Sequence, residues 1–103
     1  MELNFQTLNN IEKARLIVKL SGKINMENAA DIEKTIKSNL DNVKELLLDF
    51  SEVSYVASVG LRVLLELQKT ITAKNAAMYI KNVNDEVKNV FEITGFKNIL
   101  NII

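Results

Sequence analysis

The sequence predicts an α/β fold, a two-layer domain in which a mixed sheet of four to five strands carries helices mainly on one face. Apolar residues recur with the two-residue period of strands in some stretches and the 3.6-residue period of helices in others. Along the chain these stretches give the order β-β-α-β-α-β-α. Two right-handed crossovers that advance in the same direction place their helices on the same sheet face, so the other face is expected to stay partly open.

The first two strands are predicted to pair as a hairpin. Residues 3–7 alternate apolar with polar side chains, and residues 14–20 form a second strand-like stretch. Asn9 and Asn10 lie between them and tolerate turn conformations, so the turn is placed there. Gly22 is expected to end the second strand, because glycine often separates elements.

A helix, a strand and a longer helix follow. Residues 29–40 have apolar side chains at helical spacing, with acids early and lysines late, an order that suits the helix dipole. Residues 45–50 contain three consecutive leucines and are predicted to be an interior strand. Residues 58–73 form the second predicted helix, with apolar residues on one arc and charges opposite.

The last part of the chain is predicted to hold a strand, a helix and a docked tail. Residues 76–81 form the fourth strand. Asn84 is suited to cap a helix that Gly95 would end. The apolar residues 99–103 are expected to dock, as a short strand or over the open sheet face.

Alternation within the strands predicts which sheet face the helices cover. That face is expected to hold the apolar residues Leu16, Val18, Leu20, Leu46, Leu48, Phe50, Met78 and Ile80. The opposite face would hold the mixed set Arg15, Ile17, Lys19, Leu47, Asp49, Tyr79 and Lys81. Only the first set is uniformly apolar, so the helices are expected there.

Composition narrows the classes of function. The 103 residues suit one domain, taken as residues 1–103. Thirteen basic and thirteen acidic residues cancel, which argues against a nucleic-acid or polybasic membrane surface. The chain has no Cys and no His, so thiolate catalysis, the commonest general base and the commonest transition-metal ligand are missing. No signal peptide or membrane-spanning run is recognisable, and a cytoplasmic, non-enzymatic protein without a cofactor is expected.

Ser58 is the strongest candidate for a chemical role. It is expected at the start of the second helix, where backbone N–H groups and the dipole favour a phosphate. Gly60 would open access to the hydroxyl, at a cost of about 1 kcal/mol relative to Ala in a helix. The structural alternative is that Ser58 is an N-cap and Gly60 permits close packing of the helix on the sheet. A nucleophilic serine is disfavoured, since no His can activate it and the G-x-S-x-G motif is absent.

A family signature surrounds this serine. The chain resembles STAS domains, specifically bacterial anti-sigma factor antagonists, in the run D-F-S-E-V-S-Y-V-A-S-V-G-L-R-V-L-L at residues 49–65. The similarity covers essentially the whole chain and includes L-S-G-K-I-N at 20–25 and F-x-I-T-G-F at 91–96. It implies a STAS-like two-layer fold. The chain departs from the pattern at Ala57, where many members carry Asp or Ser.

The resemblance implies a regulatory role. In that family the serine followed one residue later by Gly, here Ser58, is phosphorylated by an anti-sigma factor that is itself a serine kinase. The unmodified antagonist binds that kinase and frees the sigma factor for transcription. The phosphorylated form does not bind, and a metal-dependent serine phosphatase resets it. ATP and its metal would then belong to the kinase.

Other interpretations of the chain's function stay open. The chain could be a non-phosphorylated STAS subunit of a transporter or signalling complex, which Ala57 favours slightly, or a small-ligand sensor at the strand exit. A metal site or a response-regulator receiver at Asp49 and Glu52 is disfavoured. A receiver would need an acidic pair after the first strand, and that strand ends without acids.

The partner surface is expected around the start of the second helix. It is predicted to include Ser54, Tyr55, Ala57, Val59, Gly60, Arg62 and Val63. On a helical wheel Val59 and Val63 lie about 40° apart near the polar side, although both valines could instead touch a neighbouring helix or loop. The open sheet face, with Ile17, Leu47 and Tyr79, is a second candidate contact.

Overall fold

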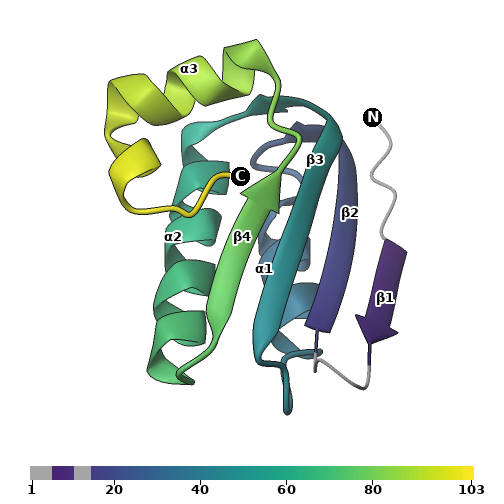
Figure 1. The fold of residues 1–103 in the computed structure, drawn as a ribbon. Coiled ribbons are helices and arrows are strands. Elements are labelled where there is room, and N and C mark those ends of the chain that lie inside the picture. Colours follow the sequence, from purple (N-terminus) through teal and green to yellow (C-terminus); the bar gives the residue numbers. More distant parts are fainter. Residues whose placement is uncertain (1–5, 11–14) are drawn as a thin grey trace.

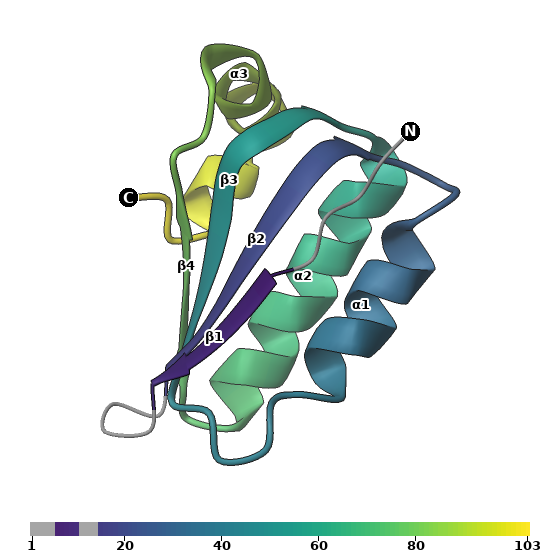
Figure 2. The ribbon, with the colours of Figure 1, turned by 90° about the vertical axis from the view of Figure 1, so that its right-hand side faces the viewer.

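The protein folds as a sheet with two helices packed on one face. The computed structural model describes residues 6–10 and 15–103 (Figure 1). In these ranges the elements are β1 (Gln6–Asn10), β2 (Arg15–Ile24), α1 (Ala29–Lys37), β3 (Glu45–Val56), α2 (Ser58–Ala73), β4 (Ala77–Lys81), α3 (Asp85–Thr94) and the short 3-10 helix η1 (Phe96–Asn98). The strands lie in the order β1-β2-β3-β4, and Figure 2 shows α1 and α2 together on one side of the sheet. The predicted α/β fold is confirmed.

The hairpin forms as predicted, but its turn is not at the two asparagines. β1 and β2 pair antiparallel, and Asn9 and Asn10 are both strand residues paired with β2. Asparagine tolerates turns without requiring them, and here the ladder extends through both residues. The prediction of a turn there is therefore wrong. The link at 11–14 and the predicted strand residues 3–5 lie outside the described residues.

Gly22 lies inside β2 and does not end it. Its φ is 84°, and the pairing of β2 with β3 shifts register between Lys19 and Ser21 and again between Gly22 and Lys23. A glycine with positive φ suits such an irregularity, which bends a strand without ending it. β2 therefore continues to Ile24.

β3 extends beyond its neighbour β4. Its parallel pairing with β4 ends at Asp49 and Lys81, whereas its pairing with β2 continues to the pair of Ile24 and Val56. Residues 51–56, expected to be the loop after an interior strand, are strand residues. The start of α3 joins this extension, because the amide Nδ2 of Asn84 donates to the Val53 carbonyl at 2.8 Å.

The C-terminal elements follow the prediction closely. Oδ1 of Asn84 accepts a hydrogen bond from the Val87 N–H at 2.8 Å, and Gly95 ends α3 with a φ of 80°. Beyond β4, Ile102 forms a parallel bridge with Ile80. The tail at 99–103 thus docks at the outer edge of β4, beside which Figure 1 shows the C-terminus. The alternative position over the open sheet face is wrong.

The core lies between the sheet and the pair α1 and α2. All eight residues predicted for the helix-facing side of the sheet are buried, and Phe50, Leu48 and Ile80 are completely so. On the opposite face Ile17 and Tyr79 remain partly exposed. The sheet therefore places β3 above one layer of helices, with its end paired to β2 (Figure 2).

Candidate functional site

The candidate site begins where β3 passes into α2 through one residue. Ala57 is the N-cap, with extended backbone angles (φ −77°, ψ 168°) and no side-chain hydrogen bond to the helix. Its N–H donates to the Ile24 carbonyl at 2.8 Å, which ties the junction to the end of β2. Ser58 is the first residue of α2, so the alternative that it acts as the N-cap is wrong.

Ser58 presents an uncommitted hydroxyl. The residue is exposed, and among the described residues its side chain makes no hydrogen bond. In the same part of the chain the N–H groups of Ser58 and Val59 have no backbone acceptor, while those of Gly60 and Leu61 both reach the Ala57 carbonyl. The hydroxyl is therefore accessible beside unsatisfied N–H donors, an arrangement that tolerates added negative charge.

Gly60 has a packing role. It is buried, and a Cβ built on it would lie 2.8 Å from Cγ2 of Ile24 and 2.9 Å from Cγ1 of Val56. The helix approaches the sheet so closely here that a Cβ at position 60 would force the side chains of Ile24 and Val56 to shift. The idea that Gly60 opens access to the serine, or contacts a partner, is wrong, and the close-packing alternative is confirmed.

The two valines of α2 do not form a surface pair. Val63 is only 5% exposed and belongs to the hydrophobic core, so its predicted place in the partner patch is wrong. Val59 is partly exposed and also packs against the core. A helical wheel places both near the polar side but cannot show that neighbouring elements cover that side.

Three of the predicted partner residues remain well exposed. These are Ser54, Tyr55 and Arg62, and Ala57 is partly exposed between them in the sequence. The Tyr55 side chain is 50% exposed, a large amount for an aromatic residue. The Ser54 hydroxyl donates a long hydrogen bond of 3.4 Å to the Gly22 carbonyl. We call these four residues, together with Ser58 and Val59, the α2-start surface: Ser54, Tyr55, Ala57, Ser58, Val59 and Arg62.

A shallow groove beside this surface was not predicted. A hollow of about 160 Å³ is lined by Ser54, Tyr55, Val56, Glu86, Val87 and Val90. A neighbouring one of about 410 Å³ is lined by Lys23, Asn25, Ser54, Tyr55 and Glu86. Sequence reasoning missed the residues from α3 because the hydrogen bond of Asn84 to Val53 that brings the helix here has no sequence signal.

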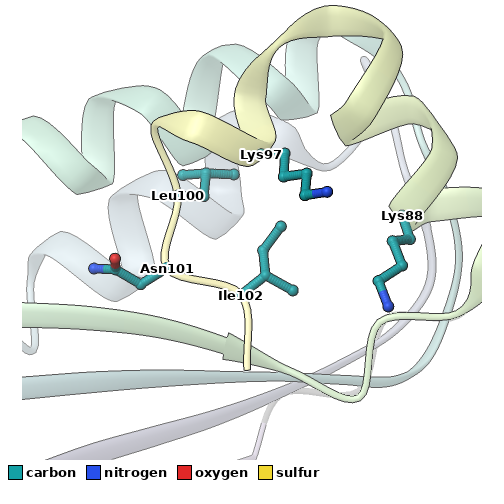
Figure 3. Close-up of a pocket in the computed structure, with 5 residues that line it drawn as sticks. All are labelled: Lys88, Lys97, Leu100, Asn101 and Ile102. Atoms are coloured by element: carbon teal, nitrogen blue, oxygen red, sulfur yellow. The ribbon is translucent and has the colours of Figure 1, made fainter.

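A third hollow lies between α3, η1 and the tail. It measures about 280 Å³ and is lined by Lys88, Lys97, Leu100, Asn101 and Ile102 (Figure 3). Lys97 is engaged by Glu92, with Nζ and Oε1 3.6 Å apart. Ligand sites usually combine an apolar wall with several fixed polar groups, and these two flexible lysines do not supply them.

The acidic residues near the end of β4 have structural partners. Partial burial acts to raise the pKa of Asp49. Hydrogen bonds from the Ser51 backbone N–H and the Asn82 amide, together with the charge of Lys81, have the opposite and larger effect. The pKa of Asp49 therefore lies below its ordinary value. Glu52 pairs with Lys19 at 3.3 Å. In residues 6–10 and 15–103 no three acidic side chains group as metal ligands would.

No helix in the described part of the chain is long and apolar enough to cross a bilayer.

Comparisons with known proteins agree on one family. The model of the STAS domain matches residues 2–103. BtrV of Bordetella bronchiseptica, named as a candidate anti-sigma factor antagonist, is 32% identical over 85 residues, which is 82% of this chain and 73% of BtrV. The anti-sigma-B factor antagonist of Staphylococcus aureus is 26% identical over 86 residues, covering 82% of this chain and 80% of that protein.

Solved structures show the same fold. The anti-sigma factor antagonist SpoIIAA in its unphosphorylated form superposes with a TM-score of 0.74 at 16% identity, over 97% of this chain and 87% of SpoIIAA. SpoIIAA of Bacillus in its phosphorylated form superposes with a TM-score of 0.73 at 17% identity, over 97% of this chain and 91% of that SpoIIAA. Both forms of that protein thus share this architecture.

Proposed function

Because the chain belongs to the STAS domain family, in the group of anti-sigma factor antagonists, we propose that it is a phosphorylation-gated binding protein. With Ser58 unmodified it binds an anti-sigma factor that is a serine kinase, and so releases a sigma factor for transcription. That kinase phosphorylates Ser58 and ends the binding, and a serine phosphatase restores it. The chain is the substrate in the cytoplasm, while ATP and its metal come with the kinase.

The observation that supports this most is the accessible, unbonded hydroxyl of Ser58 at the start of α2. A kinase must reach the acceptor oxygen from solvent, and here no hydrogen bond within the described residues has to break first. The hydrogen bond from the Ala57 N–H to the Ile24 carbonyl ties the backbone next to Ser58 to the end of β2. A partner can therefore recognise the folded surface instead of an unfolded segment.

The switch is proposed to be local. A phosphate adds about −1.5 to −2 charges, and its interaction with a helix end is worth roughly 0.3–1 kcal/mol. That is small beside a domain stability of roughly 5–15 kcal/mol, so the fold persists. Reversing a bound fraction from 99:1 to 1:99 takes about 5.5 kcal/mol, which clash and desolvation within an interface can supply.

The proposed partner surface is the α2-start surface. Arg62 and Tyr55 are residue types enriched at the centres of protein interfaces, and both are exposed here. The groove beside Tyr55 extends the surface toward Glu86 on α3. The footprint therefore combines the end of β3, the first two turns of α2 and the start of α3.

The test uses the kinase-like anti-sigma factor whose gene lies nearest to that of this chain. Incubation with this kinase and ATP is expected to add one phosphate to the chain by intact mass. Ser58→Ala should abolish the gain, and Ser54→Ala, which removes another exposed hydroxyl of the same surface, should leave it. A gain that persists in Ser58→Ala would contradict the assignment.

Binding provides the second measurement. In a titration Ser58→Ala should bind the kinase about as tightly as the unsubstituted chain, and Ser58→Asp at least about tenfold more weakly, a difference of roughly 1.4 kcal/mol. No phosphate gain together with equal affinities would favour the alternative, a STAS subunit that acts without phosphorylation.

A further inference from the structure

We propose, on the basis of the phosphorylation of Ser58 proposed above, that Arg62 receives the phosphate and forms an ion pair with it across one turn of α2. The unmodified surface would then present a free arginine, and the modified surface a paired phosphate of net negative charge. Phosphorylation would both add charge and withdraw the one cationic side chain of the first two turns of the helix.

Spacing along the helix carries the first step. Ser58 and Arg62 are four residues apart in an α-helix that runs without interruption to Ala73. Side chains at this spacing are surface neighbours, with Cβ atoms about 5–6 Å apart. The acid lies on the N-terminal side of the base, which is the favourable order for such a pair. Both residues are exposed, so no other element separates them.

Arg62 is uncommitted before modification. Among the described residues it has no ion pair or hydrogen bond, and the first turn of α2 contains no acid. Its nearest competitor along the helix is Glu66, also four residues away. The Oε1 atom of Glu66 lies 3.9 Å from Nζ of Lys69 and so already has a cationic neighbour. The guanidinium is therefore available.

The chemistry of the two groups fits. A guanidinium presents a rigid fork of donors that matches a phosphate in a bidentate manner, which a lysine ammonium cannot do. A phosphate dianion can accept several hydrogen bonds, and the N–H groups of Ser58 and Val59, which have no backbone acceptor in the described part of the chain, are further donors close to it along the chain.

The experiment installs phosphoserine at position 58 of the full chain by genetic code expansion, so no kinase is needed. Phosphorus NMR then gives the second pKa of the phosphate at about 0.1 M salt. Compared with the parent phosphoprotein, Arg62→Gln should raise this pKa by about 0.15–0.4 unit, the effect of one ion pair of this spacing, because the second ionisation adds a single negative charge to the phosphate. Arg62→Lys should fall between them. The Nε resonance of Arg62 should shift when position 58 is phosphorylated.

Lys74→Gln is the matched control, because it leaves the pair of Glu66 and Lys69 intact. It removes the same charge from the C-cap of the same helix, sixteen residues and about 24 Å from position 58, beyond the screening length at this salt. Lys23 and Glu86, the charged residues that line the hollow beside Tyr55, are unchanged in all variants. The control pKa should equal that of the parent.

An equal phosphate pKa in the parent and in Arg62→Gln, with an unmoved Nε resonance, would overturn the ion pair. That result would leave phosphorylation of Ser58 itself standing, because the phosphate is installed without a kinase. Conversely, a kinase that ignores Ser58 would refute the proposed function while the ion pair is still measured.

Discussion

The two junctions at which a parallel strand passes into a helix use their polar groups in opposite ways. Between β2 and α1, Asn28 accepts from the Asn25 N–H at 3.0 Å and donates to the Lys23 carbonyl at 2.7 Å, while Oδ1 of Asn25 accepts from the Glu27 N–H. Between β3 and α2 the link is Ala57 alone, without a side-chain cap. The first junction uses its side chains to hold the loop, and the second leaves a serine hydroxyl available.

Closeness of packing explains how the second junction is held without the side-chain hydrogen bonds that hold the loop of the first. Its helix is fixed by apolar contact at Gly60, against Ile24 and Val56. Stability there comes from the close approach of backbone to side chains and not from polar side chains. A surface hydroxyl can therefore be modified without loosening the helix.

Breaking that contact should have the largest effect. Gly60→Val places atoms where Ile24 and Val56 already lie, so we expect a loss of about 2–3 kcal/mol in the free energy of unfolding, measured by urea denaturation. Gly60→Ala should lose less, because higher helix propensity offsets part of the clash. If Gly60→Val were as stable as the unsubstituted chain, the contact would not hold the junction.

The hydrogen bonds made by Asn28 predict the next effect. Asn28 is 8% exposed, and Asn28→Ala removes its hydrogen bonds with the Asn25 N–H and the Lys23 carbonyl, so we expect a loss of about 2 kcal/mol in the free energy of unfolding. Ser58→Ala breaks no such bond and should change stability by no more than about 0.5 kcal/mol. Equal losses in parallel urea titrations would remove the distinction between the junctions.

Substitution of Asp49, which pairs with Lys81 at the end of β4, should change stability least. Its pKa is lowered in the folded state, so its carboxylate stabilises the fold above the ordinary pKa, and this contribution disappears as the pH falls through the folded value. Asp49→Asn should therefore cost about 1 kcal/mol or less at neutral pH. The difference between the two proteins should vanish in acid, as thermal unfolding at a series of pH values would show.

Element types could be predicted because local patterns were strong. The leucines of β3, the amphipathic arc of α2, and Asn84 and Gly95 at the ends of α3 each agree with the structure. Errors arose where one residue type serves two purposes. Gly22 suits a break or a bulge, and only the pairing of β2 with β3 decides between them.

The sequence could locate the candidate site along the chain, but it could not show which of the site's residues are buried. The family signature located Ser58, and exposure of that residue agrees with its proposed role. A wheel drawn from the sequence could not show that Val63 is covered, since covering depends on neighbours that are distant in sequence. The groove toward Glu86 depends likewise on a long-range hydrogen bond to the extension of β3.

The docked tail has a consequence for self-association. An edge strand with unpaired N–H and C=O groups can pair with a strand of another molecule and so extend the sheet. Here the Ile80 N–H donates to the Asn101 carbonyl, and the Ile80 carbonyl accepts from the Ile103 N–H, both at 2.9 Å. The chain thereby occupies its own sheet edge near the C-terminal end of β4, and another molecule could add a strand there only after displacing the tail.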